Sequence, residues 1–262
     1  MLSYKHIYHA GNFADVHKHL ILIALLKYLQ QDPRPYTYID THSGSGIYDL
    51  SSAEANKTSE YLDGIEAIKS SKDPAIIEYL SLIYELNNAK STRYYPGSPE
   101  IATMLARSDD IMHFCELHNN EFKLLQNNYR KFKNVFVHHH NGFEGLLSLC
   151  PPKIRRGLVL IDPSYEIKSD YEEVAQTVIK AHKKWPEAIF AIWYPMLKAK
   201  RHEEMIKAVN KLPGVVISDL VICKPDEVRG MYGTGMIIVN TPEELIGEIG
   251  VIEDALNEIY CW

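Results

Sequence analysis

The sequence predicts an α/β protein with a Rossmann-like, seven-stranded, mostly parallel sheet. Two observations carry this prediction. Short apolar segments of strand character alternate with amphipathic helical segments along the 262 residues, as in a parallel sheet covered by helices. A glycine-rich turn, Gly44-Ser45-Gly46, directly follows the first such segment. The composition, 46% hydrophobic and 24% charged, is that of one sizeable core, so we expect a single domain over residues 1–262.

Seven segments are predicted to be strands because each is short, apolar and bounded by turn residues. In chain order they cover residues 36–40, 111–116, 135–139, 158–162, 188–193, 215–222 and 236–240. Helices are expected between them. Asn12 is a predicted N-cap for a helix through residue 29, and Ser169 with Glu172 forms a capping box for a helix ending near residue 184. Residues 241–244 predict the last helix, with a threonine cap, a proline and a glutamate.

The alternation breaks between residues 47 and 93. This stretch has helical patterns over 59–70 and 74–87 but no convincing strand. We interpret 47–93 as a helical subdomain inserted after the first core strand, from where it could overhang a ligand cleft.

Composition also bounds the location and the partners. The longest apolar run, residues 20–26, is too short to cross a bilayer, and the first residues lack a signal-peptide pattern, so a cytoplasmic protein without a membrane partner is expected. The four cysteines are widely spaced, with no C-x-x-C pair, so neither a disulfide framework nor a zinc knuckle is indicated. A net charge of −6 disfavours nucleic acid in general, but basic groups gather locally at residues 5–19, 153–156 and 198–202. These clusters predict either a basic rim or ordinary solvated faces.

The amino-terminal stretch 4–19 interleaves basic and aromatic residues, which suits RNA phosphates and stacked bases. Its histidines also raise the possibility of a metal. His17 and His19 are two positions apart, however, so they point to different faces of a helix, and no cysteine or acidic cluster completes a ligand set. No metal is therefore expected.

Three strand ends predict a nucleotide-like cofactor at one edge of the sheet. Gly44 lies in the glycine-rich turn, where the backbone can approach a ligand closely. Glu116 ends the second strand, where an acid can accept hydrogen bonds from ribose hydroxyls. Asn141-Gly142 follows the third strand, although turn chemistry alone also explains that pair. Because Gly46 is not followed by a third glycine, a dinucleotide site is disfavoured.

The fourth strand ends in Asp162-Pro163-Ser164-Tyr165. This approaches the Asp/Asn-Pro-Pro-Tyr/Phe signature of methyltransferases that act on amines conjugated to a ring or amide. Such an amine is a poor nucleophile, and hydrogen bonds from it to a carboxylate and to the proline carbonyl would enrich its nitrogen. Proline fixes φ and so helps to hold that carbonyl, while Tyr165 would stack on the extruded base.

Taken together, the sequence resembles the large-subunit ribosomal RNA methyltransferase J family, the 23S rRNA adenine-N6 methyltransferases, over nearly the whole chain. The blocks that carry the resemblance are MLSYKH at 1–6, HAGN at 9–12, KH at 18–19, DTH at 40–42, EYLDGI at 60–65, RYYPGSP at 93–99, RRGL at 155–158, WYP at 193–195 and GM at 235–236.

The resemblance implies a class I methyltransferase sheet with a helical insertion and S-adenosyl-L-methionine as methyl donor, with S-adenosyl-L-homocysteine as product. By position, the implied cofactor-binding residues are His19, His42, Gly44, Ser98, Glu116, Asn141, Gly142 and Asp162. Asp162, Pro163 and Tyr165 are implied as catalytic, with Tyr4, His6, Lys18 and Tyr165 serving the RNA. The implied partner is naked or partly assembled 23S rRNA, bound by a monomer.

The chain departs from the family pattern in two places. Ser164 replaces a proline, which puts the reaction rate in doubt, and Asn141 replaces an aspartate near the cofactor adenine. Alternative functions remain: N6-adenine methylation of DNA, methylation of a protein glutamine, or a non-catalytic RNA-binding or ribosome-assembly factor that retains the cofactor pocket. A nicotinamide-dependent oxidoreductase is a more distant alternative.

Overall fold

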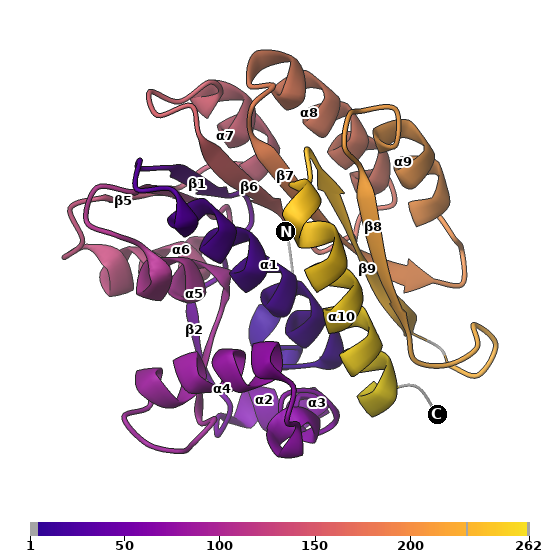
Figure 1. The fold of residues 1–262 in the computed structure, drawn as a ribbon. Helices are drawn as coiled ribbons and strands as arrows, with labels where there is room; N and C mark the ends of the chain where they lie inside the picture. Colours follow the sequence, from indigo (N-terminus) through magenta and orange to yellow (C-terminus); the bar gives the residue numbers. More distant parts are fainter. Residues whose placement is uncertain (1–4, 229, 261–262) are drawn as a thin grey trace.

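A seven-stranded sheet forms the centre of the molecule (Figure 1). The structure is a computed structural model and describes residues 5–228 and 230–260. The sheet order is β5-β4-β1-β6-β7-β9-β8. Its strands are β1 (Thr37–Asp40), β4 (Ile111–Cys115), β5 (Val135–His138), β6 (Gly157–Ile161), β7 (Ile189–Leu197), β8 (Val216–Val221) and β9 (Met231–Val239). Neighbouring strands pair in parallel except at β9, which is antiparallel to β7 and to β8. The predicted fold class is confirmed, with all seven predicted strands present.

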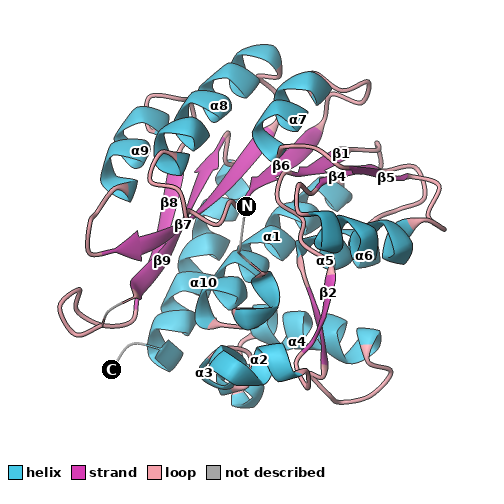
Figure 2. Cartoon of the chain, turned by 180° about the vertical axis from the view of Figure 1, so that it is seen from behind, coloured by secondary structure: helices cyan, strands magenta, loops and turns pink. Residues whose placement is uncertain are grey.

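Helices cover both faces of this sheet (Figures 1 and 2). One face carries α1 (Phe13–Gln31), α5 (Ser98–Leu105), α6 (Asn119–Tyr129) and α10 (Glu243–Tyr260), and the other carries α7 (Gly142–Leu149), α8 (Asp170–Lys184) and α9 (His202–Val209). The two faces correspond to two separate clusters of buried hydrophobic side chains. Burial of both faces explains why strands such as β6 are apolar throughout rather than alternating.

Helix α1 supplies the wall of the molecule nearest the site. As predicted, Asn12 caps it, because its side-chain oxygen accepts a hydrogen bond from the Asp15 backbone N–H at 2.9 Å. The helix is buried along most of its length between the sheet, α4 (Pro74–Leu86), α5 and α10. That burial extends to Asp15, Lys18 and His19, which are 1 to 3% exposed, so three ionisable side chains are held inside the protein.

Two local expectations are corrected. Ser169 precedes α8, but its side chain makes no capping hydrogen bond, so the predicted capping box does not form. Two short strands, β2 (Ile47–Asp49) and β3 (Tyr94–Pro96), pair antiparallel as a separate sheet at the two ends of the 47–93 segment, where no strand was expected. Between them lie α2 (Ala53–Thr58), α3 (Glu60–Asp63), the 3-10 helix η2 (Ala67–Ser70) and α4, while a further 3-10 helix, η1 (His6–Tyr8), precedes α1.

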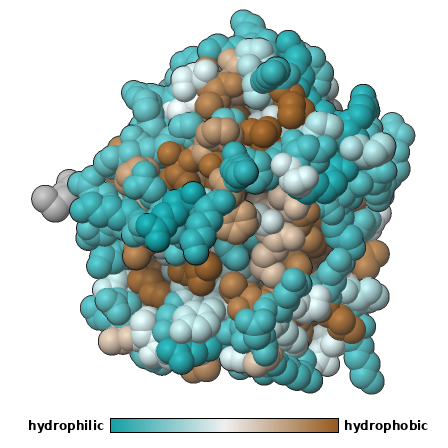
Figure 3. Space-filling model, turned by 90° about the vertical axis from the view of Figure 1, so that its left-hand side faces the viewer, coloured by the Kyte–Doolittle hydropathy of each residue, from teal (hydrophilic) through white to brown (hydrophobic). Residues whose placement is uncertain are grey.

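The surface around β5 and α6 is mostly hydrophilic with small separate hydrophobic areas (Figure 3). Exposed large hydrophobic residues in this region are Leu124, Phe132 and Phe136. Scattered exposure of this kind is common on globular proteins. No helix among residues 5–228 and 230–260 is long and apolar enough to cross a membrane.

Candidate active site at the carboxyl edge of the sheet

A cavity of about 260 Å³ opens where the parallel strands β1, β4 and β6 end. Ligands bind at this edge in open α/β sheets. The residues predicted to bind the cofactor all line it: His19, His42, Gly44, Ser98, Glu116, Asn141, Gly142 and Asp162. Of the predicted catalytic and substrate residues, Pro163, His6 and Lys18 line it too. Tyr4 lies outside the described residues.

Glu116 ties the end of β4 to the glycine-rich turn after β1. Its Oε2 accepts a hydrogen bond from the Gly44 N–H at 2.8 Å, and its Oε1 accepts one from the His118 N–H at 2.6 Å. Burial raises the pKa of the Glu116 carboxyl, while these backbone donors act in the opposite direction. Gly44 has φ +59°, and a Cβ there would lie 2.0 Å from Tyr48 Oη. Only glycine therefore lets the turn pass this close to Tyr48.

The third strand end is shaped by a helix cap. Asn141 caps α7, since its Oδ1 accepts from the N–H groups of Phe143 at 2.9 Å and Glu144 at 3.2 Å. Its side-chain oxygen, which was expected to help bind the cofactor adenine, is thus already engaged by the helix. A Cβ on Gly142 would lie 1.9 Å from the Thr41 carbonyl oxygen, so this close approach also requires glycine.

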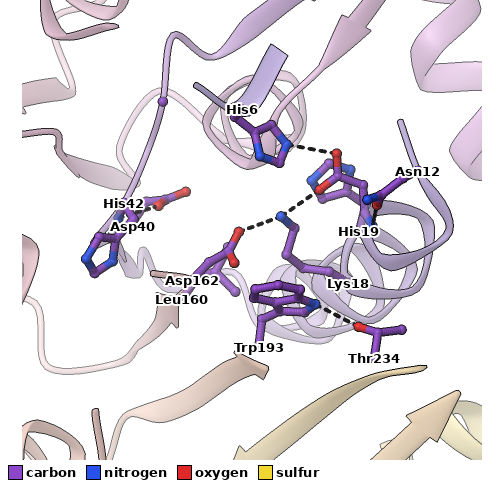
Figure 4. Close-up of polar contacts among 12 residues, drawn as sticks. His6, Asn12, Lys18, His19, Asp40, His42, Leu160, Asp162, Trp193 and Thr234 are labelled. Atoms are coloured by element: carbon purple, nitrogen blue, oxygen red, sulfur yellow. Dashed lines mark hydrogen bonds and ion pairs between the residues drawn. The ribbon is translucent and has the colours of Figure 1, made fainter. Parts of the chain in front are cut away.

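A network of ionisable side chains extends from His6 to Asp162, which follows β6 (Figure 4). Lys18 Nζ lies 2.5 Å from Asp162 Oδ2 and 2.8 Å from Asp15 Oδ1. Asp15 Oδ2 is in turn 2.9 Å from His6 Nε2 and accepts a hydrogen bond from the Gly11 N–H at 2.9 Å. Sequence reasoning missed Asp15. Its signal was a lone acid three residues before a lysine on a predicted helix.

The protonation states in this network follow from burial and charge. Burial raises the pKa of Asp162 to about 6, against the opposing effect of Lys18. Burial also opposes the charged form of Lys18, but the carboxylates of Asp15 and Asp162 outweigh it and raise the pKa of Lys18. Burial would likewise raise the pKa of Asp15, yet His6 and Lys18 hold it well below its usual value. At neutral pH the network therefore contains one ammonium and two carboxylates.

Tyr165 lies away from the cavity. It is 6% exposed, its ring centroid is 4.4 Å from that of Tyr171, and its hydroxyl donates to the Trp193 carbonyl oxygen at 2.6 Å. Its φ of +53° is unusual for a residue with a side chain, so the backbone here is strained. The predicted stacking of Tyr165 on a base requires this ring to leave its present packing.

Trp193, from β7, lies beside the Lys18–Asp162 ion pair (Figure 4). Lys18 Nζ lies 5.9 Å from the ring centroid, within cation–π range. The indole is fixed by a hydrogen bond from its Nε1 to Thr234 Oγ1 at 2.7 Å. The sequence pattern at 193–195 indicates no role for this tryptophan by itself.

The two later basic clusters, for which a basic rim and solvated faces were both open, are partly engaged by other protein groups. Arg156 donates to the Arg34 carbonyl at 2.7 Å, Arg155 pairs with Glu187 at 3.0 Å, and Lys198 pairs with Asp226 at 2.5 Å. Arg156 therefore has a structural role. Lys18, being 3% exposed, serves carboxylates in this structure rather than RNA phosphates.

Two histidines that line the cavity each have a ring nitrogen without a hydrogen-bond partner among the described residues. These atoms, the Nε2 of His19 and the Nδ1 of His118, are buried. Buried polar atoms of this kind call for a partner. Together with the carboxylate of Glu116 for hydroxyl groups, they fit a polar nucleoside ligand with both donors and acceptors. Within the described ranges, no group of three or more His, Cys, Asp or Glu side chains could hold a metal ion.

Comparisons with known proteins agree with one another. Residues 33–261 match the model of a family described as "RsmJ: Ribosomal RNA large subunit methyltransferase D, RlmJ". The chain is 37% identical to "Ribosomal RNA large subunit methyltransferase J" of Escherichia coli (strain K12) over 266 residues, covering 100% of this chain and 92% of that protein. It is 40% identical to the protein of the same name from Haemophilus influenzae over 247 residues, covering 92% and 88%.

A solved structure is similarly close. The crystal structure of a Legionella pneumophila (strain Philadelphia 1) protein matches with a TM-score of 0.89 and 35% identity, covering 96% of this chain and 94% of that one.

Proposed function

The chain belongs to the RlmJ family of ribosomal RNA large subunit methyltransferases, and we propose that it methylates the exocyclic N6 amine of one adenine in 23S rRNA. The family gives the coarser activity: the protein is an rRNA methyltransferase that uses S-adenosyl-L-methionine. The arrangement of Asp162 and Lys18 is the observation that supports the finer proposal.

Asp162 is suited to hold a conjugated amine. With a pKa of about 6, it is mostly ionised at neutral pH and acts as an acceptor. Lys18 occupies Oδ2, which leaves Oδ1 to accept a hydrogen bond from the amine. The Pro163 carbonyl is the expected second acceptor. Two such bonds concentrate electron density on a nitrogen whose lone pair is otherwise delocalised into the adenine ring.

The cofactor supplies an electrophilic methyl group when bound. Residues of this chain would hold it through the hydroxyl-accepting carboxylate of Glu116 and the cavity-lining groups of His19, His42, Ser98 and Asn141. The close turns at Gly44 and Gly142 shape the same cavity.

The amine must lose one proton as it gains the methyl group. Asp162 is positioned to take that proton, since its raised pKa makes it a better base than an ordinary aspartate. Lys18 remains beside it as a fixed positive charge that limits the rise in the Asp162 pKa. Lys18 and His6 therefore act in the site through the carboxylates they contact.

The RNA would present the adenine extruded from its strand. Tyr165 would then stack on it after rotating from its packing against Tyr171. Tyr4 and His6 would serve the RNA, as the resemblance implies. We propose that residues 1–262 act as one methyltransferase domain, with 47–93 as an insertion, and that the monomer acts on naked or partly assembled RNA.

The experiment is transfer of tritiated methyl groups to undermethylated 23S rRNA by the wild-type protein and by Asp162→Ala. Nuclease digestion and mass spectrometry then identify the product. We expect N6-methyladenosine from the wild type and a loss of labelling in the variant. Equal labelling by both proteins would overturn the catalytic role of Asp162. Labelling of DNA or protein in parallel reactions, with none of the rRNA, would overturn the proposed RNA substrate.

A further inference from the structure

Two buried tyrosines contact one nitrogen of His19. His19 Nδ1 lies 2.9 Å from Tyr79 Oη and 3.0 Å from Tyr95 Oη, and the two hydroxyl oxygens are 2.6 Å apart. Tyr79 belongs to α4 in the inserted segment, and Tyr95 to β3, which follows it. Both tyrosines are fully buried, and His19 is 1% exposed. This triangle joins the inserted segment to a residue of the cavity wall.

A proton count identifies the tautomer. Burial lowers the pKa of His19 to about 3, so the neutral ring carries one N–H proton. If that proton is on Nε2, one tyrosine donates to Nδ1 and the other donates to the first, so both hydroxyl protons are used. If it is on Nδ1, the ring donates to one tyrosine, that tyrosine donates to the other, and the last hydroxyl proton has no acceptor among the described residues. Among these three side chains, the Nε2–H form leaves only the Nε2–H without a protein partner, whereas the Nδ1–H form leaves both a hydroxyl proton and Nε2 without one. Because each unsatisfied buried polar group is costly, the Nε2–H form is favoured, and a ligand in the cavity can accept its proton.

The other ring nitrogen, Nε2, belongs to a residue that lines the cavity. It has no partner within the described part of the chain. In the Nε2–H form this nitrogen is a donor, whereas Glu116 offers an acceptor to the same cavity. The two groups therefore suit opposite kinds of ligand atom.

We propose that Tyr79 and Tyr95 are positioning residues that hold His19 as its Nε2–H tautomer, so that the ring donates a hydrogen bond to the carboxylate at the amino-acid end of the cofactor. That carboxylate is the only anionic acceptor on S-adenosyl-L-methionine, and hydrogen bonds to ionised acceptors are the stronger ones. The inference rests on the methyl donor of the family and not on which base is methylated.

The tautomer can be read directly in the ligand-free protein. Long-range ¹H–¹⁵N spectra distinguish a protonated ring nitrogen from an unprotonated one, and His19→Gln identifies the His19 signals. We expect a protonated Nε2 and an unprotonated Nδ1, unchanged between pH 5 and 8. A protonated Nδ1 would overturn the proposal without reference to catalysis.

Tyrosine variants test the consequence for binding. Tyr79→Phe and Tyr95→Phe each leave one hydroxyl that can still donate to Nδ1, so each should change S-adenosyl-L-homocysteine affinity by less than about threefold. The double variant leaves Nδ1 unpartnered and the ring unanchored, and it should weaken binding by about tenfold or more. Tyr260→Phe is the matched control, because it removes a buried hydroxyl that donates to the Gly64 carbonyl at 2.8 Å, away from His19.

A second ligand locates the bond. 5′-Methylthioadenosine keeps the adenosine and the thioether but lacks the amino-acid end, so the double variant should bind it with wild-type affinity. Equal weakening for both ligands, or unchanged affinity for S-adenosyl-L-homocysteine, would contradict the proposal. If the double variant does not fold, His19→Gln and His19→Asn decide. The glutamine can place an amide donor near the Nε2 position and should retain more affinity than the shorter asparagine, and the reverse order would refute the assignment.

Discussion

Replacing Lys18 with methionine removes the only cation that the structure places between Asp15 and Asp162 among the described residues. Lys18 Nζ is 2.8 Å from one carboxylate and 2.5 Å from the other, and its side chain is 4% exposed. Methionine keeps much of the side-chain volume but leaves two buried carboxylates facing an apolar group. Breaking a buried ion pair in this way typically costs about 3–5 kcal/mol.

The same change alters the protonation of Asp162. Without Lys18, the burial that already raises the pKa of Asp162 to about 6 is no longer opposed by the ammonium. Each 1.36 kcal/mol of lost stabilisation of the carboxylate raises its pKa by one unit, so even about 2.7 kcal/mol corresponds to about two units. The ionised fraction at pH 7 would then fall from about nine-tenths to about one-tenth, and the rate by about tenfold.

The assay is single-turnover methylation of undermethylated rRNA between pH 5.5 and 9.5. We expect the acid limb of Lys18→Met to move to higher pH, with much of the lost rate recovered near pH 9. Lys27→Met is the matched control, because Lys27 lies on the same helix but pairs with Glu78 on the surface. An acid limb at the same pH in Lys18→Met and wild type, whatever the absolute rate, would refute the link between Lys18 and the Asp162 pKa.

Three further predictions follow from burial and close contacts. Because the folded-state pKa of Asp162 is raised, its contribution to stability is present below its unfolded pKa near 4 and is lost as pH rises through 6. The difference in free energy of unfolding between Asp162→Asn and wild type should therefore shift in favour of the variant as pH rises from 4 to 7, by at most about 3 kcal/mol in urea unfolding, on top of a pH-independent cost of losing the Lys18 pair. A difference that does not change with pH would contradict the raised pKa. Gly44→Ala should weaken S-adenosyl-L-homocysteine binding in calorimetry, because the added Cβ would lie 2.0 Å from Tyr48 Oη. Gly247→Ala is the control: a Cβ there would have no atom within 4 Å, and the change should raise the melting temperature slightly. Similar binding by the two variants would argue against the close turn at Gly44. Tyr165→Ala should lower the free energy of unfolding by about 3–5 kcal/mol and also slow methylation. Tyr165→Phe should lower the free energy of unfolding by only about 1 kcal/mol and keep the methylation rate. A large loss of rate in Tyr165→Phe would oppose a stacking role.

The sheet was predictable from the sequence because its strands are apolar throughout and are separated by helices. Strands β7 and β9 are longer than predicted, running to Leu197 and from Met231, where the antiparallel pair extends beyond its most apolar part. The pair β2 and β3 was missed because three-residue strands carry too little pattern, and they pair across about forty-five residues of intervening chain.

The cavity lining was predictable because strand ends of a parallel sheet converge on one edge, so Gly44, Glu116 and Asp162 are brought together by topology alone. The contacts among the side chains were not. Tyr165 follows Asp162 by three positions, and only the fold shows that its ring turns away toward Tyr171. The role of Asn141 as a helix cap likewise depends on where α7 begins.

The amino-terminal segment shows most clearly how burial changes the meaning of a charge. Its basic and aromatic residues suggested an RNA-binding arm, yet α1 carries Asp15 and Lys18 one turn apart into the interior, where the lysine reaches Asp162. An isolated carboxylate at that depth would be largely protonated and would lose its value as an acceptor for an amine. The buried lysine limits the rise of the Asp162 pKa, and the buried Asp15, itself held by His6 and the Gly11 N–H, keeps that lysine charged. The positive charge of Lys18 thus maintains the Asp162 carboxylate, and this lysine is engaged by two buried carboxylates instead of being exposed to RNA phosphates.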